Sequence, residues 1–275
     1  MLKPISLLIL LAVTSIADAQ YYYNDIINNK TVTGDLAKFK GEKVRSVKVH
    51  SLESDGMESE GFVCTKTMNR DFTRVELYTQ MDNAYPSLFT SYFSKDGSLE
   101  KTVDSSEEAV KTITYEYNGQ KALTRIYSYT DFPGEDDADN TSEEHLYQYN
   151  EQGLLTALDV IKNNRDKVHI IFMPDEKGNI SIEKNINTGD IYYYYYDEKK
   201  NLTDVVHSYK GRATMVPDYK FEYNFAGQVV KMVASEKEGA YYFTWRYTYD
   251  NGLRTTERCY SKEGKLMGSV EYENK

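Results

Sequence analysis

The stretch YYYDEKKNL, residues 194–202, decides the fold of this chain. Tyr194 and Tyr196 are two positions apart, so their side chains share one face of a β-strand, and aromatic residues favour strands. Asp197 can accept backbone hydrogen bonds within a turn, and Leu202 begins the next apolar segment. The stretch therefore predicts a β-hairpin with a loop of about four residues.

The same pattern recurs along the chain. Each copy has an aromatic pair, then Asp, Asn or Ser, then a turn residue that is usually glycine, then an apolar residue; the turn residues are 97, 119, 153, 178, 200, 227, 252 and 264. Lys200 replaces glycine in one copy, and we expect the adjacent Asn201 to adopt the left-handed backbone there. Such recurrence indicates a repeat protein whose units stack on their neighbours.

The segments between the turns also alternate, most clearly over 241–249. We therefore predict an all-β protein in which tandem antiparallel β-hairpins form one long twisted or rolled repeat sheet. Residues 86–275 form the hairpin array, and 20–85 a less regular N-terminal β portion. Short helices are expected over 24–39 and 102–110. An open sheet of this kind has two edges that invite pairing with another chain.

The composition of the chain argues against nucleic-acid binding and against a disordered protein. The formal net charge of −10 opposes binding to nucleic acid, because a phosphate backbone needs a positive surface. The chain carries 26 tyrosines, which is too many aromatic residues for a disordered protein. Tyrosine is therefore expected to fill part of the core that aliphatic residues usually fill.

The N-terminus predicts export. Residues 5–16 form an apolar run that follows a lysine and precedes Ala17-Asp18-Ala19, which is the pattern of a Sec signal peptide over 1–19. The run is too short to span a bilayer. The mature protein is expected to begin at Gln20, to lack a membrane span, and to be periplasmic, at the cell surface or extracellular.

The repeat over residues 91–272 resembles the YD-repeat (Rhs-type) family of bacteria, whose unit reads Tyr-x-Tyr-Asp-x-x-Gly-x-Leu. The resemblance implies a long antiparallel sheet of tandem hairpins that curves or rolls. Large members of that family enclose a toxin domain. This chain has about eight units, so the resemblance implies neither encapsulation nor toxicity.

Sites with metal or catalytic chemistry are weakly signalled. The sequence has no nucleophile, zinc or nucleotide motif, so no cofactor is expected. Asp136, Asp137 and Asp139 place several oxygens in one loop, which is either a Ca²⁺ site or a solvated acidic insertion. Cys64 and Cys259 either form a disulfide or remain free, half-buried thiols.

Aromatic rows are the strongest functional candidates; they comprise Tyr192, Tyr193, Tyr194, Tyr195, Tyr196, Tyr242 and Trp245. Exposed tyrosines can stack on sugars, whereas buried ones stabilise the sheet. The sequence favours a non-catalytic exported protein that binds a glycan, a cell-envelope component or a protein partner through a Tyr-rich sheet face. Two alternatives remain: a hydrolase of polysaccharide or peptide with its site in the concave face, and an immunity-type protein that neutralises a toxin. A deep pocket with converging carboxylates would favour the hydrolase.

Overall fold

The structure, a computed structural model, describes residues 21–82, 84–134, 140–208, 215–236 and 239–275. Its elements are α1 (Tyr23–Gly41), β1 (Ser46–Glu53), β2 (Val63–Met68), β3 (Arg74–Gln80), β4 (Ser87–Phe93), β5 (Leu99–Ser105), β6 (Val110–Tyr117), β7 (Leu123–Asp131), β8 (Thr141–Tyr149), β9 (Leu155–Lys162), β10 (Asp166–Pro174), β11 (Ile180–Asn185), β12 (Ile191–Tyr196), β13 (Leu202–Ser208), β14 (Met215–Tyr223), β15 (Val229–Glu236), β16 (Tyr241–Asp250), β17 (Leu253–Tyr260) and β18 (Leu266–Asn274).

Strands of this chain close into a barrel. Each strand pairs antiparallel with the next, and β18 returns to pair with β1 from Val47↔Asn274 to Glu53↔Gly268. The predicted antiparallel hairpins are confirmed, but the open sheet is wrong, because its two edges pair with each other in an 18-stranded sheet. Closure depends on the tilt and stagger of all strands together, which no single hairpin motif specifies.

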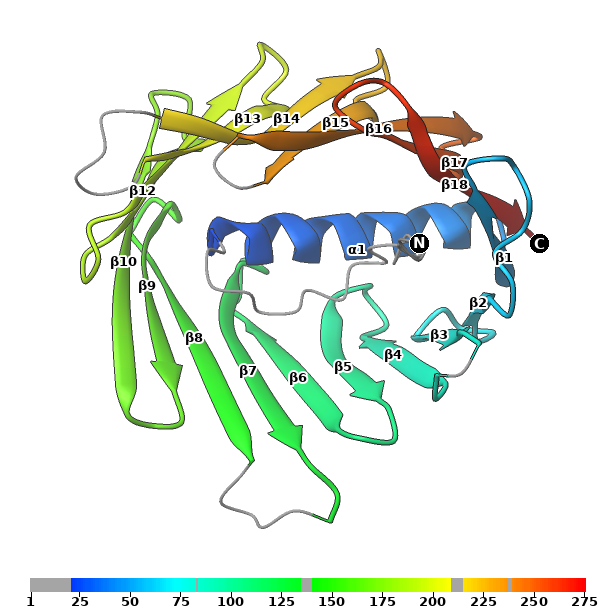
Figure 1. The fold of residues 1–275 in the computed structure, drawn as a ribbon. Coiled ribbons are helices and arrows are strands. Elements are labelled where there is room, and N and C mark those ends of the chain that lie inside the picture. The colour runs from blue at the N-terminus through cyan, green and yellow to red at the C-terminus, as the bar shows by residue number, and fades with distance from the viewer. Residues whose placement is uncertain (1–20, 83, 135–139, 209–214, 237–238) are drawn as a thin grey trace.

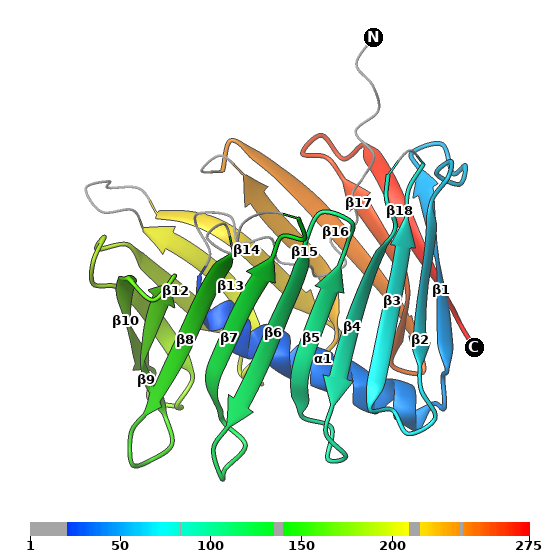
Figure 2. The same ribbon diagram turned by 90° about the horizontal axis from the view of Figure 1, so that it is seen from below.

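The N-terminal portion differs most from the prediction. Helix α1 lies inside the barrel and crosses it, with strands β3–β8 on one side and β13–β17 on the other (Figures 1 and 2). The expected helix over 24–39 is confirmed and is longer, and β1–β3 are regular barrel strands rather than an irregular portion. The helix expected over 102–110 is wrong: residues 102–105 pair with β4 as part of β5, residues 106–109 connect the two strands, and Val110 begins β6.

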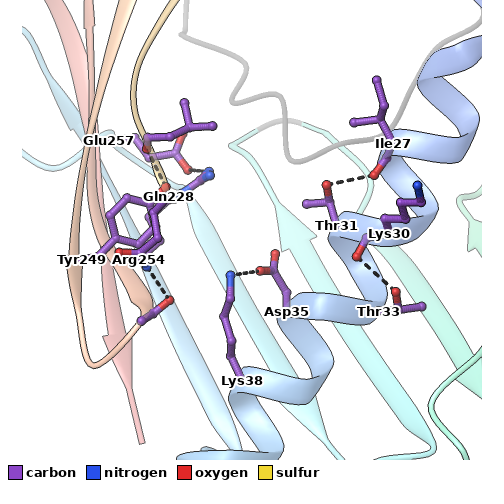
Figure 3. Close-up of polar contacts among 12 residues, drawn as sticks. Ile27, Lys30, Thr31, Thr33, Asp35, Lys38, Gln228, Tyr249, Arg254 and Glu257 are labelled. Carbon is purple, nitrogen blue, oxygen red and sulfur yellow. Dashed lines mark hydrogen bonds and ion pairs between the residues drawn. The ribbon is translucent and has the colours of Figure 1, made fainter. Parts of the chain in front are cut away.

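Helix α1 is stabilised by contacts among its own residues. Asp25 in its first turn and Lys38 and Lys40 in its last turn complement the helix dipole. Figure 3 shows the Thr31 hydroxyl donating to the carbonyl of Ile27 and an exposed Asp35–Lys38 ion pair of 3.0 Å. Because barrel walls lie on both sides, the helix carries no single apolar stripe, which explains the weak helical signal in its sequence.

The repeat turns follow one hydrogen-bond scheme. The Asp or Asn side chain accepts the amides two and four positions later, as Asp197 does from Lys199 and Asn201 at 2.9 and 2.8 Å. Lys200 itself adopts φ +65°, so the expectation that Asn201 would do so is wrong. In another copy Lys121, not Gly119, has the positive φ, +61°. Both lysines therefore occupy the position that glycine favours.

Tyrosine hydroxyls tie neighbouring hairpins together. The second aromatic of a repeat donates its hydroxyl, at 2.6 to 2.7 Å, to the carbonyl of the first residue of a strand in the preceding hairpin. The pairs are Tyr117–Leu99, Tyr149–Leu123, Tyr196–Ile180, Tyr223–Leu202 and Tyr249–Val229. Each of these tyrosines follows a β-bulge, which redirects its ring. The motif thus specifies both the turn and the contact between units.

Candidate functional site

A cavity of about 610 Å³ lies between helix α1 and the barrel wall. Its lining follows one side of the helix from Tyr22 to Phe39 and takes side chains from strands β2 to β13. One helix face and the inward residues of consecutive strands thus enclose one elongated space. Its two ends differ in chemistry.

One end is mainly apolar. Val32, Leu36 and Phe39 of the helix cluster with inward residues of β3, β4 and β5, which are Val75, Leu77, Phe89, Phe93 and Leu99. Lys66 projects into this end from β2, where its strand partners Val47 and Leu77 are both buried. Its Nζ lies 5.5 Å from the centre of the Phe39 ring. Burial lowers the pKa of the Lys66 ammonium.

The other end holds a charged network. Both ring nitrogens of His145, on β8, lie 2.7 Å from carboxylates, Nδ1 from Asp25 of the helix and Nε2 from Glu143. Burial alone would lower the pKa of His145, but these two bonds raise it to about 9. The Tyr147 hydroxyl also donates to Asp25, and Lys162 lies 3.3 Å from Glu143.

A buried carboxylate on β11 binds the backbone at the start of the helix. Glu183, on β11, is 2% exposed and accepts the backbone amides of Tyr22 and Tyr23 at 2.9 Å and the Tyr194 hydroxyl at 2.6 Å. Burial raises the pKa of Glu183 to about 7, against the effect of these three donors. A carboxylate at a helix N-terminus is stabilising. Glu183 and the His145 network therefore fix the helix in the lumen.

Acidic and basic side chains converge at this cavity. Whether they could catalyse a reaction depends on which of their atoms are already occupied by hydrogen bonds. A general base needs a free lone pair within reach of a substrate. Protonated His145 has both nitrogens occupied by carboxylates, and Glu183 already accepts three donors. A further pair, His207 and Asp218, lies 3.9 Å apart, with the His207 ring stacked on Tyr192. The arrangement of His145 and Glu183 suits positioning of the helix better than proton transfer.

Residues singled out from the sequence are separated by the structure. Tyr192 and Tyr194 are buried in the lumen against Tyr21, and Tyr196 is half-buried on the same face. Tyr193 and Tyr195 lie on the outer face, where Tyr195 is 48% exposed. On β16, Trp245 pairs with buried Cys259 on the lumenal face, whereas Tyr242 is on the opposite face. These residues do not form one surface.

The structure describes the two cysteines but not the three candidate metal ligands. Cys64 and Cys259 are free and buried, which agrees with the alternative of free thiols rather than a disulfide; β18 and β1 lie between their strands. Asp136, Asp137 and Asp139 lie outside the described residues. Within the described residues, no group of three or more His, Cys, Asp or Glu side chains is arranged to hold a metal ion.

Lys66, His145 and Asp25 were not singled out from the sequence. His145 is two residues before Tyr147, so the alternation of β8 places both side chains on the same, lumenal face. The sequence therefore contained a pattern that could have predicted an inward-facing His145. Nothing in the local sequence places Asp25 beside His145, because 120 residues separate them. Among the described helices, none combines the length and the apolar character that crossing a membrane requires.

No protein-family model and no curated protein matches this chain. Similar solved structures include a porin-like protein from Bacteroides uniformis ATCC 8492, with 12% identity and TM-score 0.40 over 84% of this chain and 98% of that one. The TcdB2-TccC3 structure matches at 10% identity and TM-score 0.37, over 78% of this chain and 15% of that one. A protein of unknown function from Nostoc punctiforme PCC 73102 matches at 9% identity and TM-score 0.18, over 87% and 98%. At these values the architecture rests on this chain's own strand pairing.

Proposed function

We propose that this chain is an exported, non-catalytic binding protein that holds a single-chain anionic amphiphile, such as a fatty acid, in its lumen. The observation that carries the proposal is the 610 Å³ cavity along helix α1, whose volume lies within the roughly 300–1,000 Å³ of small-molecule sites. The predicted binding role is kept, but its site moves from an outer sheet face to the inside of the barrel.

The shape of the cavity supports a long, narrow ligand. Its lining runs from Tyr22, the residue before α1, to Phe39 of the helix, and a rise of 1.5 Å per residue makes that length about 26 Å. Aliphatic and phenyl side chains of β3–β5 line this end, beside the polar lining residues Ser91, Thr102, Asp104 and Lys111. An extended acyl chain would bury its apolar surface there, which provides the main driving force for binding.

Lys66 supports an anionic head group. An ammonium among apolar side chains is costly unless it is paired. Among the described residues, no carboxylate forms an ion pair with Lys66 Nζ; Asp35, the nearest acidic lining residue on the helix, pairs with Lys38. A ligand carboxylate at Lys66 would supply the missing partner, with its chain along Leu77 and Phe93.

Export and lack of catalysis rest on separate arguments. The apolar run and Ala17-Asp18-Ala19 support a signal peptide over 1–19. The engagement of His145 and Glu183 in hydrogen bonds supports a non-catalytic role. The hydrolase alternative would require one of these groups to be released on binding a substrate.

Titration calorimetry with palmitate and with hexadecanol tests the proposal. Ser91, which is buried and lines the cavity, is changed to Phe to fill the space; Thr114→Phe, on the outward side of the same wall, is the matched control. We expect one palmitate per chain, weakened at least tenfold by Ser91→Phe and unaffected by Thr114→Phe. Equal binding by both variants, or no binding by the wild type, would contradict the proposal. Circular dichroism checks that Ser91→Phe folds.

Lys66→Met distinguishes recognition of the ligand's carboxylate from burial of its acyl chain. It should weaken palmitate about tenfold and leave hexadecanol unchanged, since only the carboxylate uses the ammonium. Lys48→Met, an exposed lysine on the neighbouring β1, is the control. Equal losses for both ligands would show that Lys66 does not recognise the charge.

A further inference from the structure

Three cations lie side by side on the outer face of the barrel. In the strand register Lys231 is opposite Arg246, and Arg246 is opposite Arg258, across β15, β16 and β17. Arg246 and Arg258 are exposed. Like charges directly opposite on neighbouring strands destabilise a sheet, so this row carries a structural cost. It also stands out on a chain whose net charge is −10.

The two arginines lack carboxylate partners. Glu222 continues the row on β14, but its carboxylate is 2.7 Å from Lys231. Glu271 on β18 is opposite Thr256 rather than Arg258. Among the described residues, neither guanidinium forms an ion pair or a hydrogen bond. Their donors therefore remain available to a ligand.

The row lines a second cavity, a groove of about 320 Å³. The rest of its lining is Thr248, Thr256, Val230, the rings of Tyr247 and Tyr260, and Glu222, whose carboxylate is paired with Lys231. Guanidinium groups bind phosphate in a bidentate manner, and two adjacent ones match its several oxygens. A phosphate monoester carries a charge of about −1.5 to −2 at pH 7, which the row complements.

We propose that Lys231, Arg246 and Arg258 form a surface site for a phosphate monoester, distinct from the lumenal cavity. The phosphate takes the two guanidinium groups, and the molecule that carries it lies over the threonines. Such a ligand relieves the repulsion between the arginines. The site is independent of the proposed lumenal function, because its residues face away from the lumen.

Calorimetric titration with glucose 6-phosphate, with glucose as the uncharged control and ionic strength held constant, tests the site. The variant is Arg246→Gln with Arg258→Gln. Its matched control is Arg70→Gln with Arg165→Gln, two exposed arginines in turns elsewhere on the barrel, which changes the net charge equally. We expect saturable binding that the first double variant weakens at least tenfold and the control leaves unchanged. Absence of binding both here and in the vesicle arm described below, or equal losses in both variants, would overturn the proposal.

Thermal unfolding without ligand separates a binding role from a structural one. Removing the like-charge pair should raise the melting temperature of the Arg246→Gln, Arg258→Gln variant, while phosphate binding is lost. A lowered melting temperature would overturn the proposal, because the arginines would then serve the sheet. Binding to vesicles that contain phosphatidic acid is measured as a second arm, beside the glucose 6-phosphate titration. Binding in either arm supports a site for a phosphate monoester. Binding in only one arm identifies whether a sugar or a lipid carries the phosphate.

Discussion

Removing the five tyrosine hydroxyls that tie the hairpins tests how the barrel is held together. The change is Tyr→Phe at 117, 149, 196, 223 and 249. Each hydroxyl donates to a backbone carbonyl at 2.6 to 2.7 Å, and losing such a bond costs about 1 kcal/mol. Neighbouring sites are two strands apart, or four between Tyr149 and Tyr196, which is about 10 Å or more, so their effects should add to about 5 kcal/mol.

Urea unfolding followed by circular dichroism measures this loss. A total of about 5 kcal/mol is a large part of the stability of a typical domain, so the midpoint should fall steeply while the slope stays constant. Tyr195→Phe is the control, because that ring is 48% exposed on the outer face. A fivefold variant within about 1 kcal/mol of the wild type would refute the role of the hydroxyls.

Three further outcomes follow from single sites. Lys121→Gly and Lys200→Gly should each stabilise the barrel by about 1 kcal/mol in urea, because both lysines have positive φ; a loss would contradict the turn assignment. Lys66→Met should raise the unligated melting temperature, because it removes a charge among apolar side chains; a decrease would point to a structural partner for Lys66. The raised pKa of His145, about 9, adds stability that is full below pH 6.5 and is lost as pH rises to 9. Unfolding measured across that range should show this decline, and His145→Gln should flatten it; an unchanged slope would contradict a charged His145.

Local features of the fold could be predicted from the sequence because they depend on neighbouring residues. The alternation before Asp197 and the side-chain acceptor at that position set one hairpin, and the structure confirms both. The hydroxyl of Tyr196 was missed as a tie, because its acceptor, the carbonyl of Ile180, belongs to another hairpin.

Long-range features could not be predicted. Pairing of Val47 with Asn274 joins opposite ends of the chain, and no motif encodes it. Helix α1 was only weakly signalled, because walls on both sides remove the one-sided apolar pattern that identifies a surface helix. The cavity depends on both features, so the candidate site moved from exposed tyrosines such as Tyr195 to the lumen beside Lys66.

The position of a bound amphiphile tests the central claim most directly. A crystal structure with palmitate brominated at its terminal carbon would place the bromine by its anomalous signal. The account predicts a bromine between helix α1 and strands β3–β6, with the carboxylate at Lys66. Bromine found only on the outer face of the barrel, with the lumen unchanged, would contradict it.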